Sequence, residues 1–356
     1  MSSLSGFTRN PYDLERDTGG SSCGTGAAIA ADLALIGVGE DTGGSIRVPS
    51  SFCGLAGIRC TPGLISRKGL SPLLVPQDTP GPMCRTVTDV AVMLDAMVGF
   101  DAGDLYTAAA VIAGKPVGGS YAANFSTETI KKAKIGVLRE VFGPDSDPEC
   151  ASVNKVVNST LAQLQDAGTT FVDVEIPNLK YYLELTFMYQ SRSRFDLDSF
   201  FSRHPFLQTD IKQIYENKQY HPTLDIFETM ATGIKHPRED PEFVDRLFAR
   251  DDLQRLIIAT IASHDLDALA FPDVQIPAPL TKDLLANRWK GSGFPTNTLI
   301  ASQALLPAVS VPAGLTENGG LPVGLELLGI PYREQSLLEL AFGVEQLTLA
   351  RRPPNL

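Results

Sequence analysis

The sequence predicts an α/β protein, because segments typical of strands and segments typical of helices alternate along most of the chain. The 356 residues are 43% hydrophobic and 20% charged, which excludes disorder as the main state. Glycine and proline are frequent, with 31 and 25 residues, but they are not periodic. Collagen-like and coiled-coil architectures are therefore excluded as well.

Six short apolar segments are predicted to be strands. The segment 171–176, Phe-Val-Asp-Val-Glu-Ile, alternates apolar and polar side chains, which is typical of a half-buried strand. The segment 268–272, Ala-Leu-Ala-Phe-Pro, is apolar and stops at a proline. The other four are residues 58–62, 133–138, 307–312 and 323–328.

Six longer segments are predicted to be helices. Residues 88–98 have helical periodicity, with Thr86 or Thr88 as the N-cap. Residues 149–167 form an amphipathic pattern followed by Gly168, where a left-handed cap is favoured. The other helices are expected at residues 27–36, 183–201, 242–264 and 335–346. Residues 1–18, 37–57 and 101–132 are expected to be irregular.

The charge pattern excludes nucleic-acid binding as a main function. The net charge is −11, and the densest basic cluster contains only Lys131, Lys132 and Lys134. Protein affinity for nucleic acid depends on many phosphate contacts, which this chain does not offer in one place.

No membrane or secretion signal is visible. The longest apolar stretch, residues 27–38, is broken by Asp32 and falls short of the roughly 18 residues that a spanning helix needs. Residues 1–17 lack the basic and apolar regions of a signal peptide. We therefore expect a cytoplasmic protein with no membrane partner.

Cysteine and histidine patterns predict neither disulfides nor a metal. The five cysteines include no Cys-x-x-Cys pair and are typical of free thiols in a reducing compartment. The four histidines are scattered, so no zinc cluster is expected. We expect no cofactor.

The glycine-serine segment 19–26, Gly-Gly-Ser-Ser-Cys-Gly-Thr-Gly, has three interpretations. A phosphate-binding loop would need a lysine after its second glycine, and no lysine lies between residues 17 and 67. A dinucleotide fingerprint would need a third glycine, but Ala27, Ala28 and Ile29 follow Gly26. The remaining simple interpretation is a flexible loop.

A second glycine-rich turn follows. Ser45 lies 24 residues after Ser21, within residues 39–49, Gly-Glu-Asp-Thr-Gly-Gly-Ser-Ile-Arg-Val-Pro. Glycines allow the backbone to approach a substrate closely. The consecutive amides of Thr42, Gly43, Gly44 and Ser45 are candidates for an oxyanion hole, which requires donors that converge on one oxygen.

Together these segments resemble the signature of the amidase signature family. Residues 19–24 match Gly-Gly-Ser-Ser-x-Gly, residues 41–49 match Asp-Thr-Gly-Gly-Ser-Ile-Arg-x-Pro, and residues 53–57 match Cys-Gly-x-x-Gly. Residues 63–67, 78–83, 297–298, 306–314 and 320–325 resemble further blocks of the family. The resemblance implies a mixed central β-sheet flanked by helices, in a single amidase domain over residues 1–356.

The resemblance also implies a mechanism, the hydrolysis of a small-molecule carboxylic amide through an acyl-serine. Ser45 matches the nucleophile. Ser21 matches a bridging serine on a cis peptide bond, so the two hydroxyls are expected within about 3 Å of each other. A lysine is the terminal base in the family, and no metal takes part. Ser22, Asp41 and Arg47 are expected to support the site.

One departure from the family pattern concerns the base. In the family the lysine lies well before the first serine motif, but residues 1–20 contain no lysine. We therefore expect an N-terminally short member that lacks the lysine-bearing segment and the neighbouring N-terminal elements, with an open sheet edge in their place. The domain is then partial at its N-terminus.

Three functions stay open at this point. The chain is an amidase-type hydrolase, an amidase-type subunit of a glutamine-dependent amidotransferase, or a catalytically inactive family remnant. A homo-oligomer and an amidotransferase partner are both compatible with the sequence.

Overall fold

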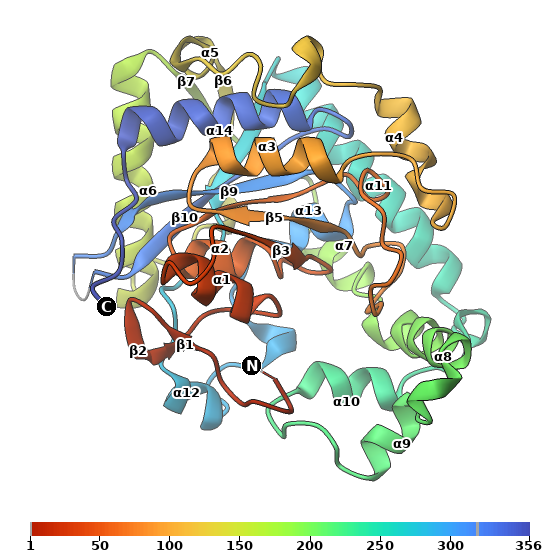
Figure 1. The fold of residues 1–356 in the computed structure, drawn as a ribbon. Helices are drawn as coiled ribbons and strands as arrows, with labels where there is room; N and C mark the ends of the chain where they lie inside the picture. Colours follow the sequence, from red (N-terminus) through yellow and green to blue (C-terminus); the bar gives the residue numbers. More distant parts are fainter. Residues whose placement is uncertain (1, 318–319) are drawn as a thin grey trace.

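The computed structural model describes residues 2–317 and 320–356 and is built around one eight-stranded sheet (Figure 1). The strand order is β3-β5-β4-β9-β10-β8-β6-β7. Strand β6 pairs in parallel with β7 and β8, and the other neighbours are antiparallel, so the expected mixed sheet is confirmed. The bounds are Ile36–Glu40 (β3), Ala56–Arg59 (β4), Pro80–Cys84 (β5), Lys134–Leu138 (β6), Thr170–Val174 (β7), Ala268–Pro272 (β8), Ala308–Leu315 (β9) and Pro322–Leu328 (β10).

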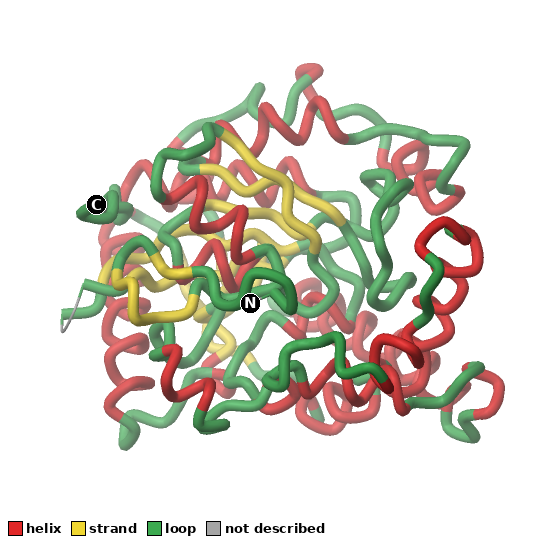
Figure 2. The backbone as a smooth tube through the Cα atoms, turned by 60° about the horizontal axis from the view of Figure 1, so that its bottom comes forward, coloured by secondary structure: helices red, strands yellow, loops and turns green. Residues whose placement is uncertain are grey.

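Helices cover both faces of this sheet, and Figure 2 shows the strands as a twisted layer between them. On one face lie α3 (Val87–Met97), α5 (Thr127–Lys132), α6 (Pro148–Ala167) and α14 (Glu334–Thr348). On the other lie α1 (Cys23–Ala30), α2 (Arg47–Phe52), α7 (Leu179–Leu185), α11 (Phe243–Ser263) and α13 (Leu299–Gln303). Each face has its own buried apolar cluster, so the sheet is the shared wall of two cores.

Smaller elements surround this frame. A π-helical turn, Tyr189–Ser193, leads into a lobe made of α8 (Arg194–Arg203), α9 (Ile211–Glu216) and α10 (Asp225–Thr232), which packs around a separate apolar cluster. The hairpin β1–β2 (Arg9–Asn10, Asp13–Asp17) lies beside α12 (Thr281–Leu285). A 3-10 turn, Leu105–Thr107, precedes α4 (Ala108–Ala113).

The predicted helix ends agree with the structure where capping residues mark them. Thr86 caps α3 by accepting a hydrogen bond from the Asp89 amide, as expected for that N-cap. Gly168, with φ +122°, ends α6, because its conformation is costly for any residue with a Cβ. Strands β6, β8 and β10 and helices α11 and α14 also lie within two residues of their predicted bounds.

The predicted helix 27–36 is wrong in its second half. Helix α1 ends at Ala30, and Ile36 begins strand β3, which was expected to be an irregular glycine-rich segment. The glycines of β3 make this strand possible. A Cβ on Gly37 would lie 2.5 Å from the Thr25 side chain, and one on Gly39 would lie 2.8 Å from Ile46. The strand therefore packs directly onto α1 through its backbone.

Three other expectations are corrected. Residues 183–201 form α7, the π-helical turn and α8 rather than one helix, and residues 101–132 contain short helices rather than only loop. Residues 80–84 form strand β5 despite two prolines. Pro80 and Pro82 alternate, so their missing N–H groups fall on one edge of the strand, and the ladder to β4 involves only Met83 and Cys84.

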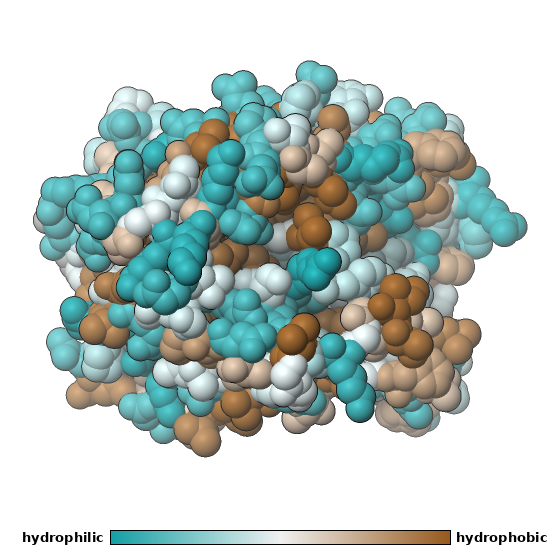
Figure 3. Space-filling model, turned by 90° about the horizontal axis from the view of Figure 1, so that it is seen from above, coloured by the Kyte–Doolittle hydropathy of each residue, from teal (hydrophilic) through white to brown (hydrophobic). Residues whose placement is uncertain are grey.

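Strand β3 is an open edge of the sheet. Its outward side chains are apolar, with Ile36 45% and Val38 47% exposed, and Leu35 just before the strand is 67% exposed. On the face that α3 and α14 cover, by contrast, apolar and polar side chains are interspersed (Figure 3). Among the described residues, no helix combines the length and the apolar composition that crossing a membrane requires.

Candidate active site

The two serine turns lie side by side, each directly before a helix. Ser21 and Ser22 precede α1, and Ser45 precedes α2. The Ser22 amide donates a hydrogen bond to the Ser45 carbonyl at 3.3 Å, which joins the two turns. The Gly20–Ser21 peptide bond is cis.

The two serine hydroxyls are accessible and unpaired. Ser21 is exposed and Ser45 is partly buried. Neither hydroxyl has a hydrogen-bond partner within residues 2–317 and 320–356, so the expected bond between them is not formed in this structure. The structure thus brings the two turns together and leaves both reactive groups open.

Gly44 fixes the shape of the nucleophile turn. Its φ is +121°, and a Cβ at this position would lie 1.9 Å from the Thr298 hydroxyl oxygen. That hydroxyl donates a hydrogen bond to the Gly43 carbonyl at 2.8 Å. Only glycine therefore fits between α13 and the turn.

The amides of this turn differ in availability. The Gly44 amide donates to the Asp41 carboxylate at 2.9 Å, so it is already engaged. In the part of the chain that the structure describes, the amides of Thr42, Gly43 and Ser45 have no acceptor. Three of the four predicted oxyanion donors are thus free to bind an incoming oxygen.

Asp41 is the anchor beneath the turn, and it is completely buried. One carboxylate oxygen accepts from the Gly44 amide and the other from the Ile46 amide at 3.2 Å. The guanidinium groups of Arg47 and Arg59 lie 3.1 and 3.0 Å from the first oxygen. Burial by itself raises the pKa of Asp41, but the charges of the two arginines outweigh it and hold that pKa well below its usual range.

A second buried pair of acids balances the arginines. Arg47 forms an ion pair with Glu326 at 2.5 Å, and Glu326 and Asp273 are both completely buried. Burial raises the pKa of Asp273 well above its usual range, and the charge of Glu326 adds to this effect. One proton held by this pair leaves two positive and two negative charges in the cluster, which is neutral overall.

A third pair of acids lies on the other side of the turn. The Thr42 hydroxyl is 2.7 Å from Asp78 and 3.2 Å from both oxygens of Glu40. Asp78 also accepts from the amides of Leu73 and Leu74. Burial and then the charge of Asp78 raise the pKa of Glu40 well above its usual range.

Sequence reasoning assigned no role to several of these residues. Glu326 is a lone charge in the apolar strand Val-Gly-Leu-Glu-Leu-Leu, which is a signal for a buried partner. Thr298 belongs to a block that resembles the family, but its contact with Gly43 spans 255 residues of sequence. The Tyr189 hydroxyl also faces Gly43, since a Cβ there would lie 2.8 Å from it. No sequence spacing connects these positions with the turn.

The remaining predicted residues are placed as follows. The Ser22 hydroxyl accepts from the Glu40 amide at 3.1 Å, so it joins α1 to β3 rather than touching the other serines. Lys68 is exposed and lies beside Gly103. Within the described residues, no group of three or more His, Cys, Asp or Glu side chains could hold a metal ion.

This fold and these motifs define a class of protein, and comparison with known proteins agrees. The sequence model of the family described as Amidase matches residues 1–338, so the chain belongs to the amidase family. It is 34% identical to the amidase-family component of the glutamyl-tRNA(Gln) amidotransferase from Moorella thermoacetica, over 98% of this chain and 71% of that protein.

Solved structures place the chain in the same family. The peptide amidase from Stenotrophomonas maltophilia superposes with a TM-score of 0.81 at 31% identity, over 98% of this chain and 69% of that one. The corresponding component of the glutamyl-tRNA(Gln) amidotransferase from Thermotoga maritima superposes with a TM-score of 0.70 at 26% identity, over 96% and 68% of the two chains.

The first prediction concerns the anchor. Asp41→Asn leaves two buried guanidinium groups short of a counter-charge, so the free energy of unfolding should fall by about 3–5 kcal/mol. Urea denaturation measures this change. Asp13→Asn, which removes a partly exposed partner of Arg16, is the control and should cost less than about 1 kcal/mol. Equal losses in the two variants would contradict the anchoring role.

The second prediction concerns Glu40 and pH. Its pKa is raised in the folded state, so its contribution to stability is present below the ordinary value of 4.5 and is lost as pH rises toward the folded pKa. Between pH 5 and pH 8 the free energy of unfolding should therefore decline more in the wild type than in Glu40→Gln. Denaturation across this range measures the difference, with Glu175→Gln at an exposed site as control. Parallel curves for wild type and Glu40→Gln would refute it.

Proposed function

We propose that the chain is an amidase-type hydrolase that cleaves a carboxylic amide through an acyl-serine on Ser45. The observation that carries this proposal is the juxtaposition of the Ser21 and Ser45 turns, joined by the hydrogen bond from Ser22, in a member of the amidase family. We also propose that residues 1–356 act as one catalytic domain, in a reducing cytoplasmic compartment; the buried free cysteines, Cys23, Cys53, Cys60, Cys84 and Cys150, support the latter.

In the proposed first step the Ser45 hydroxyl oxygen attacks the amide carbonyl and transfers its proton through Ser21 to a base. The carbonyl oxygen becomes an oxyanion, which the free amides of Gly43 and Ser45, with Thr42, would bind. The Gly44 amide is left out, because it already binds Asp41. The base then protonates the leaving amine, and water hydrolyses the acyl-serine by the same route in reverse.

The base is the group that the Ser45 turn itself does not offer. The family resemblance implies a lysine that reaches Ser21, and residues 2–67 contain none. Ser21 is exposed, so an ammonium group from another segment or another chain has access to it. We propose that full activity depends on such a lysine.

A second candidate function is favoured by the relatives. The Moorella thermoacetica relative is named as one component of a glutamyl-tRNA(Gln) amidotransferase. By analogy, this chain would release ammonia from an amide for a partner protein. Glutaminase activity that appears only with a partner chain would distinguish this function from independent hydrolysis, and the absence of any acylation would indicate an inactive remnant.

The third prediction concerns acylation. An oxyanion hole supplies about 3 kcal/mol per donor even without a base, so p-nitrophenyl esters should acylate the protein slowly at one serine. Ser45→Ala should abolish this burst, whereas Ser159→Ala, at an exposed serine on α6, should leave it unchanged. Release of p-nitrophenol and the mass of the intact protein measure the two effects. Labelling that survives in Ser45→Ala would assign the nucleophile elsewhere.

The fourth prediction concerns the base. General-base help is worth about a hundredfold or more, so residues 1–356 alone should turn over unactivated amides very slowly. An extended protein that carries the lysine-bearing segment of a family relative ahead of Ser2 should hydrolyse them at least about a hundredfold faster. The same extension with its lysine changed to methionine is the control. Equal rates with and without the lysine would refute this assignment.

A further inference from the structure

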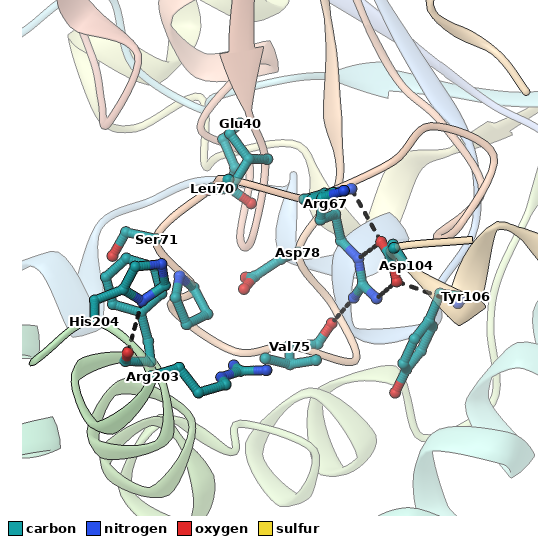
Figure 4. A pocket seen from close by; sticks show the side chains of 15 residues that line it. Glu40, Arg67, Leu70, Ser71, Val75, Asp78, Asp104, Tyr106, Arg203 and His204 are labelled. Atoms are coloured by element: carbon teal, nitrogen blue, oxygen red, sulfur yellow. Dashed lines mark hydrogen bonds and ion pairs between the residues drawn. The ribbon is translucent and has the colours of Figure 1, made fainter. Parts of the chain in front are cut away.

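A second cavity adjoins the nucleophile turn on the side away from Arg47. It has a volume of about 500 Å³ and lies between the end of β3, the segment 67–78, the turn 103–106 and the end of α8. Figure 4 shows its charged side chains arranged around a common space, with Asp78 pointing into the middle. None of the roles proposed above uses this cavity.

The inner side of the cavity is acidic. Asp78 is only 4% exposed, and Glu40 is partly buried beside it. Both lie within 3.2 Å of the Thr42 hydroxyl, and neither forms an ion pair with any described residue. The side chain of Glu40 has no hydrogen-bond partner other than Thr42 among the described residues, so its carboxyl group is poorly satisfied.

The outer side of the cavity is basic. Lys68 and Arg203 are both exposed at its rim, and neither is in an ion pair within the described part of the chain. The Nε of Arg203 donates to the Ser199 carbonyl, which leaves its terminal nitrogens open. Arg67 is different, because its guanidinium already binds the Asp104 carboxylate at 2.9 Å.

Unpaired charges of opposite sign thus face one another across a space instead of neutralising each other. A ligand with a cation at its inner end and an anion at its outer end would complement both sets. Leu70, Pro72 and Val75 line the same space and offer contact for an apolar stem. We propose that this cavity binds a small aliphatic zwitterion, with its ammonium group toward Glu40 and Asp78 and its carboxylate toward Lys68 and Arg203.

The site is linked to the nucleophile turn through one residue. The Thr42 hydroxyl binds Asp78, while Gln77 donates to the Thr42 carbonyl at 2.6 Å. A ligand at Glu40 and Asp78 is therefore separated from the free amides of the turn by the Thr42 side chain. The binding proposal does not depend on hydrolysis, because it concerns only the cavity and its charges.

Isothermal titration of the whole chain tests the proposal with three probes of one length. The probes are 6-aminohexanoate, hexylamine, which lacks the carboxylate, and hexanoate, which lacks the ammonium group. A charge-assisted contact contributes about tenfold in affinity or more, so 6-aminohexanoate should bind at least about tenfold more tightly than either of the others. The Ser45→Ala protein should bind it equally well, which separates this test from the test of hydrolysis.

Two variants assign the ends of the ligand. Glu40→Gln should weaken binding of 6-aminohexanoate and hexylamine by about tenfold and leave hexanoate unchanged. Arg203→Gln should weaken 6-aminohexanoate and hexanoate, by about threefold because the group is exposed, and leave hexylamine unchanged. Glu175→Gln, at an exposed acid outside the cavity, is the matched control and should change nothing.

Several results would overturn the proposal. These are no saturable binding of 6-aminohexanoate at about 10 mM, well beyond the millimolar affinity of the weakest specific ligands, equal affinities for all three probes, or the same loss in Glu175→Gln as in Glu40→Gln. Thermal denaturation checks that each variant is folded. If Glu40→Gln does not fold, the exposed Arg203→Gln still decides whether the carboxylate end is recognised.

Discussion

The buried carboxylate of Asp41 is the constraint on which the geometry of the site depends. It accepts two backbone amides of the nucleophile turn and the guanidinium groups of Arg47 and Arg59. Burying an isolated carboxylate costs several kcal/mol, so the group persists in the interior only because these partners replace water. The turn therefore cannot move without breaking a cluster of charges that reaches into strands β4 and β10.

This cluster places the turn, and close backbone packing then fixes it. Gly19, with φ +74°, lies so near α2 that a Cβ would meet the Val48 side chain at 2.8 Å, and Gly44 meets Thr298 even more closely. The two serine turns are thus pressed against α2 and α13 by their own backbones. Side chains at these glycines would separate the two turns, which is why two glycine-rich segments accompany two serines.

The fold could be predicted from the sequence where local chemistry marks an element. Strand β8 and helix α6 were found because an apolar run, a proline and a terminal glycine delimit them. Strands β3 and β5 were missed, because glycine and proline normally interrupt strands, and only the contacts with α1 and β4 explain them here. For the site, the serines and Asp41 follow from a motif, whereas Arg59, Glu326 and Thr298 reach the turn through tertiary contacts that no spacing encodes.

The front and the back of the nucleophile turn have opposite character. At the back, the carbonyl of Gly43, the amide of Gly44 and the side chain of Asp41 are all hydrogen-bonded. At the front, the hydroxyls of Ser21 and Ser45 have no partner among the described residues. Donors that are held rigidly but not yet occupied stabilise a developing charge without first having to reorganise. The arrangement therefore places the energetic cost of order in the folded protein rather than in the reaction, and what the front still requires is a group that can take a proton from Ser21.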